Sequence, residues 1–145
     1  SIYSLADYQA PESQLDAGFI QVWPVAESSV SGLSHGDQIK GVAPEVVVDL
    51  VDLYPDSWTY AQVYKGSPQL GTDGTIVPNS SFLIDGTVPR DETLRLTDWD
   101  AVIDEDGEWT LEIITVTPFG ADRLSYLSFD VERTIRINGA VTSVE

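Results

Sequence analysis

The chain has no cysteine and no methionine among its 145 residues. Without cysteine it has no disulfides, thiolate metal ligands or thiol nucleophiles, so packing alone must hold its core together. The single histidine, His35, lies in a glycine-flanked loop, and no nucleophile elbow, phosphate-binding loop or metal-ligand triplet accompanies it. The sequence therefore predicts a protein that is not an enzyme.

Positive charge is scarce. Only 7 basic residues stand against 24 acidic ones, which gives a formal net charge of -17, and the basic residues are scattered along the chain. Because such a chain repels phosphate, we expect no nucleic-acid partner. Three explanations of the acidity remain: solubility and resistance to association, adaptation of the surface to salt, and cation binding at carboxylate clusters.

Long apolar runs are also missing. No run approaches the roughly 20 residues of a spanning helix, so we expect no membrane span. The chain begins at Ser1 rather than at a methionine, from which we expect a processed product, made by removal of the initiator or by cleavage of a longer precursor. The length suits one domain with a two-layer core.

The clearest strand signal follows an acidic turn that closes on Gly107. In the stretch 104–117, Trp109, Leu111 and Ile113 alternate with polar residues, and the rest of the stretch is rich in β-branched side chains. Alternation with a period of two places these three side chains on one face. The pattern predicts the central strand of a β-sandwich, packed on one side.

Other short strands follow the same logic, and no segment sustains a helical period. The run 45–53 is apolar on nearly both faces, which favours a buried strand, and Pro78 interrupts another. Asn138-Gly139 between β-branched runs predicts a terminal hairpin. The remaining predicted strands are 18–23, 29–33, 58–65, 75–84, 93–96 and 124–131. The prediction is an N-terminal arm (1–17), a sandwich domain (18–133) and a C-terminal extension (134–145) that forms a β-ribbon.

About seven short strands separated by turn signals argue for an immunoglobulin-like sandwich. The phrase DGEWTLEIITVTPFGADRLSYLSFDVERT resembles the closing strand pair of bacterial and archaeal immunoglobulin-like (Ig-like) domains of surface, adhesin and filament proteins. The upstream VWPVAESSVSG and EVVVDLVDL look similar to early strands of that family, and the resemblance covers about 18–134. It implies an all-β, Ig-like β-sandwich of about seven to nine strands.

Two features depart from that family. The outer face of the central strand turns apolar at Ile114 and Val116, and both ends of the chain carry arms. The N-terminal arm has apolar anchors at Ile2, Tyr3, Leu5 and Tyr8, which would be wasted in a solvated linker. Either the arm folds back on its own domain, or it docks on a neighbouring subunit as an added strand or a draped segment. Both departures predict a surface that the arms or another chain cover.

An aromatic stripe on the predicted strand 58–65 has two interpretations. Trp58, Tyr60 and Tyr64 share one face of the strand, where they would make a ligand face that stacks on sugar rings. Ig-like folds also bury a tryptophan on this strand, which favours a core role. Trp23 and Trp99 divide in the same way, whereas Trp109 is the surest core residue.

An acidic segment and a glycosylation pattern are two further candidate sites, each with a simpler interpretation. The acidic segment around 98–108 is a candidate for calcium binding, but its spacing does not match an EF-hand, and a solvated acidic loop is the favoured interpretation. Asn79-Ser80-Ser81 is a pattern for N-glycosylation in a predicted loop, meaningful only if the chain is exported. The candidate metal ligands are Asp98, Asp100, Asp104 and Asp106.

These patterns favour a non-enzymatic structural subunit of an extracellular or virion-surface assembly, such as a filament, an adhesin, a surface array or a decoration protein. Its arms would contact other copies of itself or neighbouring structural proteins. The alternative is a monomeric carbohydrate- or receptor-binding Ig-like module that uses the aromatic stripe. In either case we expect an extracellular, cell-surface or virion-surface location, with calcium as the one candidate cofactor.

Overall fold

The computed structural model of the protein describes residues 24–137 and 140–143. This part of the chain contains strands and turns but no helix, and therefore no apolar helix of membrane-spanning length. The strands are β1 (Glu27–Ser31), β2 (Gln38–Ile39), β3 (Val46–Leu53), β4 (Ser57–Lys65), β5 (Thr75–Ile84), β6 (Arg90–Leu96), β7 (Gly107–Thr117), β8 (Gly120–Val131), β9 (Thr134–Ile137) and β10 (Ala140–Ser143).

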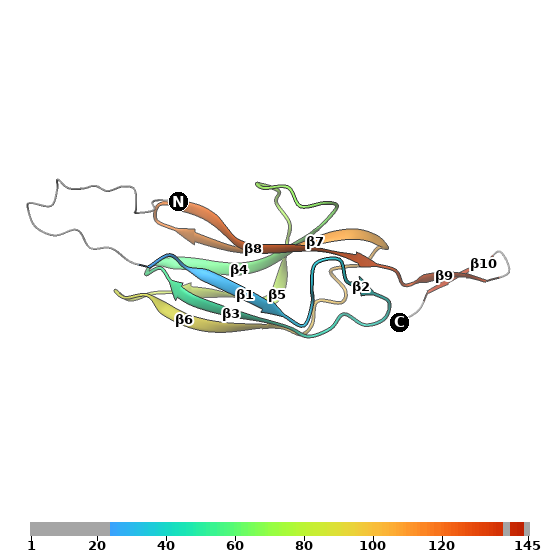
Figure 1. The fold of residues 1–145 in the computed structure, drawn as a ribbon, viewed down its shortest axis with the longest axis horizontal. Coiled ribbons are helices and arrows are strands. Elements are labelled where there is room, and N and C mark those ends of the chain that lie inside the picture. The colour runs from blue at the N-terminus through green and yellow to red at the C-terminus, as the bar shows by residue number, and fades with distance from the viewer. Residues whose placement is uncertain (1–23, 138–139, 144–145) are drawn as a thin grey trace, which may run out of the picture.

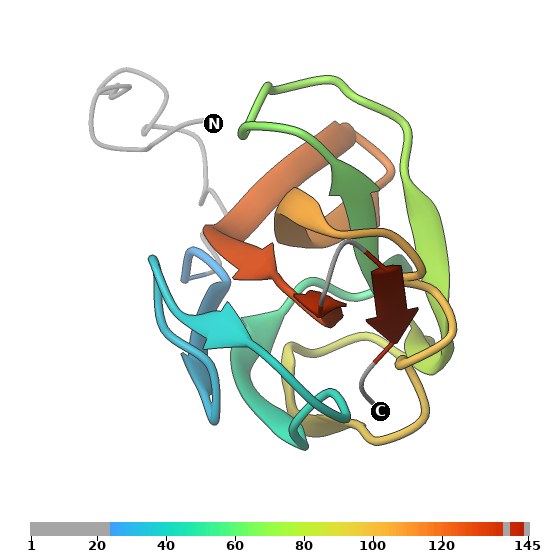
Figure 2. The same ribbon diagram turned by 90° about the vertical axis from the view of Figure 1, so that its right-hand side faces the viewer.

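Two sheets pack face to face, as the sequence predicts (Figures 1 and 2). One sheet has five strands in the order β2-β8-β7-β4-β5, and the other has three in the order β1-β3-β6. Every pairing is antiparallel except that of β2 with β8, which is parallel. The all-β sandwich is thus confirmed.

The strand β7 lies at the centre of the larger sheet, between β4 and β8. Its alternation is as predicted, because Trp109, Leu111 and Ile113 are buried in the core between the sheets. A register shift against β8 follows Ile113. Beyond it Ile114 and Val116 lie half-buried on the outer face of the sheet, opposite residues of β4.

The strand β3 corrects one prediction. It packs on one face only: Val46, Val48, Leu50 and Leu53 are fully buried, whereas Val51 is 42 % exposed on the other side. The pattern misleads because a bulge interrupts the alternation. The register shifts between Leu50 and Leu53, and Asp52 between them has a positive φ of 60°. The bulge turns Leu53 back toward the core.

Further features differ from the sequence prediction: β1 and β6 both begin before their predicted first residues. The segment 119–123, predicted as a loop, belongs mostly to β8, so that only a tight turn separates β7 from β8. The two-residue strand β2 was not predicted, since its pairing depends on a distant partner. Asn79 lies inside β5, with a positive φ of 58° beside the irregularity at Pro78, and not in a loop. The predicted strand 18–23 lies outside the described residues.

The predicted C-terminal ribbon is present as the antiparallel pair β9 and β10, which extends past one end of the sandwich (Figure 1). Arg133 fixes its base. The guanidinium Nε donates to the carbonyl of Gly41 (2.8 Å), Nη1 donates to the carbonyl of Ile103 (3.0 Å), and Nη2 pairs with the carboxylate of Asp100. The Asp106 carboxylate accepts the backbone N–H groups of Arg133 (2.9 Å) and Thr134 (3.1 Å).

Candidate functional site on the outer face of the five-stranded sheet

Strand pairing joins the predicted ligand face and the predicted apolar residues into one surface. Trp58 lies opposite Val116, and Tyr60 lies opposite Ile114. On the other side of β4, Leu83 of β5 lies opposite Trp58. We call this surface the outer-face patch; it consists of Trp58, Tyr60, Ile76, Leu83, Ile114 and Val116.

The two aromatic rings of the patch pack on each other, with centroids 4.7 Å apart and planes inclined by 40°. The Trp58 side chain is 40 % exposed, so the interpretation of Trp58 as a core residue is wrong. The inward positions of β4 hold Ser57, Thr59, Ala61 and Val63 instead. Because these inward side chains are small, larger residues of neighbouring elements fill most of the core. The aromatic side chains of β4 point outward.

Tyr64 shares this face but is not part of the open surface. The loop 66–74 between β4 and β5 covers it, and the Tyr64 hydroxyl accepts a hydrogen bond from the backbone N–H of Gln69 (3.0 Å). Burial raises the pKa of Tyr64, as do the hydrogen bond and charge of Glu112. The predicted ligand face therefore reduces to Trp58 and Tyr60.

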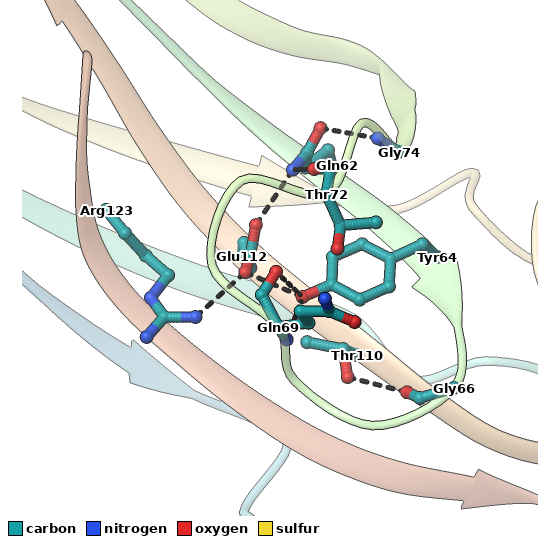
Figure 3. A network of polar contacts seen from close by, with 9 residues as sticks. All are labelled: Gln62, Tyr64, Gly66, Gln69, Thr72, Gly74, Thr110, Glu112 and Arg123. Atoms are coloured by element: carbon teal, nitrogen blue, oxygen red, sulfur yellow. Dashed lines mark hydrogen bonds and ion pairs between the residues drawn. The ribbon is translucent and has the colours of Figure 1, made fainter.

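Under this loop lies a buried carboxylate that the sequence analysis did not single out. Glu112, only 1 % exposed, accepts hydrogen bonds from Gln62 Nε2 at Oε1 (2.8 Å) and from the Tyr64 hydroxyl at Oε2 (2.7 Å), as Figure 3 shows. Arg123 Nη1 forms an ion pair with Oε2 at 3.0 Å. Four groups from three adjacent strands thus satisfy one another on the outer face.

The same network ties the loop to the sheet. Gln62 Nε2 also donates to the carbonyl of Thr72 (3.0 Å), and Gln62 Oε1 accepts the backbone N–H of Gly74 (2.9 Å) (Figure 3). At the margin, the Arg123 guanidinium lies 3.8 Å from the ring centroid of Tyr126, which is half exposed. In the sequence, a period of two places Gln62 on the face of Tyr60 and Tyr64, and Glu112 on the face opposite Leu111 and Ile113, but only the β4–β7 register puts the two side chains opposite each other.

The outer-face patch is apolar and aromatic in a chain with a net charge of -17, and it borders the ion pair of Arg123 and Glu112, since Arg123 lies opposite Ile114. Leu83 on β5 is 72 % exposed, whereas Ile114 and Val116, on β7 at the opposite side of the patch, are half-buried. Aromatic and aliphatic side chains arranged in this way suit two kinds of contact. They can pack against another apolar protein surface, or they can stack on the apolar face of a sugar ring.

A separate shallow hollow of about 610 Å³ lies beside His35, Glu108 and Ser128. The Ser128 hydroxyl donates to Glu108 Oε2 (2.6 Å), and the backbone N–H of Ser128 donates to His35 Nδ1 (3.1 Å). The hydroxyl is therefore hydrogen-bonded to the carboxylate and not to the imidazole. This arrangement lacks the contact between nucleophile and base that acyl transfer requires.

The hydroxyls of Ser128 and then Ser67, which donate to Glu108, hold the pKa of its carboxyl below the ordinary glutamate value. A lowered pKa in the folded state stabilises the fold above the ordinary value, and this contribution is lost as the pH falls through the lowered one. We expect Ser128→Ala to move the pKa of Glu108 upward, as followed by NMR titration of its side-chain carboxyl. The pKa of Asp106, held low chiefly by the backbone N–H of Arg133, serves as the control and should not move. An unchanged Glu108 pKa would contradict this assignment.

The predicted calcium ligands do not converge. Within residues 24–137 and 140–143, no group of three or more acidic or histidine side chains is placed to hold a metal ion. Two of the four predicted ligands, Asp100 and Asp106, bind the guanidinium and the backbone of Arg133 instead. A cationic side chain from the end of β8 thus supplies the positive charge that was expected from calcium, and calcium binding at this segment stays a prediction without a preformed site.

The N-terminal anchors Ile2, Tyr3, Leu5 and Tyr8, and also Trp23, lie outside the described residues. A scan against protein-family models found no match, and a search of curated proteins found none either. The role of the chain is therefore argued from its geometry.

Proposed function

We propose that the chain is a non-enzymatic structural subunit of an extracellular or virion-surface assembly, and that the outer-face patch and the N-terminal arm contact neighbouring subunits. The observation that carries the proposal is a partly exposed apolar patch on one sheet face of a strongly acidic protein. Apolar side chains exposed together across three strands, β5, β4 and β7, are typical of a contact surface. Excess negative charge elsewhere opposes association in other orientations.

The strand order supports the Ig-like part of the proposal. The sheets β1-β3-β6 and β8-β7-β4-β5 correspond to strands A-B-E and G-F-C-C′ of an immunoglobulin variable domain. The position of the tryptophan differs from that family, because Trp58 on the strand equivalent to C faces outward. Ig-like sandwiches serve many unrelated roles, so the fold gives the architecture while the patch gives the function.

The first test measures the mass in solution by light scattering. We expect the full chain to form multimers and a variant lacking residues 1–15 to form fewer or none, with the sandwich still folded. We also expect Ile76→Asp in the patch to weaken assembly, while Val51→Asp leaves it intact. Both side chains are 42 % exposed on outer sheet faces, which makes Val51 a matched control. A full chain that is monomeric at every concentration and salt level would contradict the proposal.

The second candidate is a monomeric carbohydrate- or receptor-binding module, favoured by the packed rings of Trp58 and Tyr60. For this function we expect Trp58→Ala to abolish binding to an array of glycans and to leave the thermal unfolding midpoint nearly unchanged. An array that binds the Trp58→Ala variant as well as the native chain would argue against a sugar platform. Salt titration separates the candidates further, because screening of the like charges should strengthen assembly and leave sugar stacking unaffected.

A further inference from the structure

The strand β8 has an open edge. On one side it pairs with β7 along its whole length, from Gly120 to Val131. On the other side it pairs with β2 only at Asp130 and Val131, and Ser128 adds two hydrogen bonds: its carbonyl accepts from the N–H of Gly36, and its N–H donates to His35 Nδ1. Among the described residues, no strand pairs with β8 from Gly120 to Leu127 on this side, although β1 of the other sheet lies close to Ser125. The free edge is about 25 Å long.

The hydrogen bonds at the paired end indicate which backbone groups point outward. Ser128 accepts from Gly36, Asp130 donates to the carbonyl of Asp37, and Glu132 donates to the carbonyl of Ile39. Because backbone groups alternate along a strand, the N–H and C=O groups of Tyr126 point to the same open side. An incoming strand there would continue the row of hydrogen bonds that β2 begins.

The gap between the sheets beside this edge is lined by apolar side chains that are only partly covered. Ala26 and Val30 of the β1 side and Leu124 of β8 are half-buried against the core. The hydroxyls of Ser28 and Ser125 meet across the gap at 2.6 Å. An added strand would therefore gain both backbone hydrogen bonds and apolar burial.

The other long edges are less receptive. Pro78 and a register shift interrupt β5. The strand β6 carries Arg90, Asp91, Glu92 and Arg95 along its edge. Proline, irregularity and charge are the devices by which sheet edges avoid unwanted pairing. The edge of β8 has a bulge at the Leu124 step, which limits the registers in which another strand can pair.

We propose that residues 18–23 of a neighbouring copy pair with this edge of β8 as an added strand. This segment, GFIQVW, is rich in β-branched and aromatic residues, and a period of two would place Ile20 and Val22 on one face and Phe19, Gln21 and Trp23 on the other. Ile20 and Val22 would enter the gap beside Val30 and Leu124, while Phe19 and Gln21 would lie beside Tyr126 on the outer face. The inference rests on the proposed assembly function and names the edge and the segment through which it works.

A neighbouring copy suits the connection better than the chain's own segment. The described chain enters β1 at Glu27, in the three-stranded sheet. Ser28 already lies beside Ser125, and the chain runs on from there to pair in parallel with the end of β8, so the residues before β1 lead away from Tyr126. To place residues 18–23 beside its own Tyr126, the chain would have to reverse direction within Pro24, Val25 and Ala26. Proline holds the residue before it in extended conformations. Short connections under such strain favour exchange of the segment between copies.

The test uses the absence of cysteine in the chain. One full-length variant carries Phe19→Cys or Gln21→Cys, and the other carries Tyr126→Cys. Mixed under mild oxidation, they should form a disulfide-linked heterodimer at least about tenfold faster than a mixture with Thr93→Cys, an exposed position on the edge of β6. Residues on one face of paired strands lie within reach of a disulfide.

Each outcome of this experiment either supports or overturns the proposed pairing of residues 18–23 with β8. Selective intermolecular linkage at Tyr126 supports the proposal. A double variant, Gln21→Cys with Tyr126→Cys, that closes an intrachain disulfide in dilute solution overturns it in favour of the chain's own segment. If the native chain forms multimers but the variants do not link at Tyr126, the proposed pairing at β8 is wrong, while the proposed assembly function still holds. A native chain that is monomeric and shows no linkage overturns both the edge and the proposed function.

Discussion

Replacement of Arg123 by alanine is expected to lower the free energy of unfolding by about 3 kcal/mol. The guanidinium pairs with Glu112 at 3.0 Å, and that carboxylate is 1 % exposed. Removing Arg123 leaves a buried negative charge without its cationic partner, which costs far more than an exposed pair contributes. Urea denaturation of the native chain and the variant measures the difference.

A matched control is available at Arg95. It pairs with Glu45 at 3.5 Å, with both side chains largely exposed, so Arg95→Ala should cost less than about 0.5 kcal/mol. In a Glu112→Gln background, Arg123→Ala should lose most of its effect, because no buried charge remains to be paired. Equal costs at Arg95 and Arg123 would rule out the buried pair as the origin of the loss.

Replacement of Trp99 by alanine should be the most damaging change in the core, at about 4 kcal/mol. The indole is fully buried, packs edge-on against Phe129 with centroids 5.7 Å apart, and donates from Nε1 to the carbonyl of Pro44 (2.8 Å). The substitution creates a cavity and also leaves that carbonyl without its donor.

The control is Trp58→Ala, which removes the same atoms from the outer-face patch and should cost about 1 kcal/mol. Chemical denaturation followed by far-ultraviolet circular dichroism avoids reliance on tryptophan fluorescence, which both substitutions change. A large loss of stability at Trp58 would mean that the patch is structural, and it would remove the basis for a binding role there.

The contrast between these two tryptophans illustrates what local sequence patterns can predict. Alternation placed Trp109 in the core correctly, because neighbouring polar residues on β7 identify the inner face. On β4 both faces carry apolar residues, so alternation alone could not choose between them. The inner face of β4 carries small side chains, of which Ala61 and Val63 belong to the same core cluster as Trp99, and Trp99 packs on Phe129 there.

The candidate site was partly predictable. Ile114 and Val116 were expected on an outer face, and Trp58 and Tyr60 on a shared face, but their union depends on the β4–β7 register. Glu112 was missed for the same reason, since its partners Gln62 and Arg123 come from two other strands. Register is a property of pairs of strands, and a single strand's pattern carries little information about it.

The acidic segment shows the limit of compositional reasoning. Carboxylates close together in sequence suggested a cation, but Asp100 binds the guanidinium of Arg133 and Asp106 accepts the backbone N–H of the same residue, which lies about 30 residues further along the chain. A cluster of carboxylates in the sequence predicts that a positively charged group lies nearby, but the identity of that group depends on the fold.

The contacts of Arg133 give the C-terminal ribbon a mechanical role in any assembly that pulls on it. One side chain joins the end of β8 to Gly41, Asp100 and Ile103, in two loops that lead into other strands. A pulling force on β9 and β10 would therefore be shared at Arg133 between two paths. One is the long β7–β8 strand pair, which would be loaded in shear, and the other is the pair of loops that Arg133 contacts. The sandwich would resist such a load as one body, and the hairpin would peel apart before the domain extends.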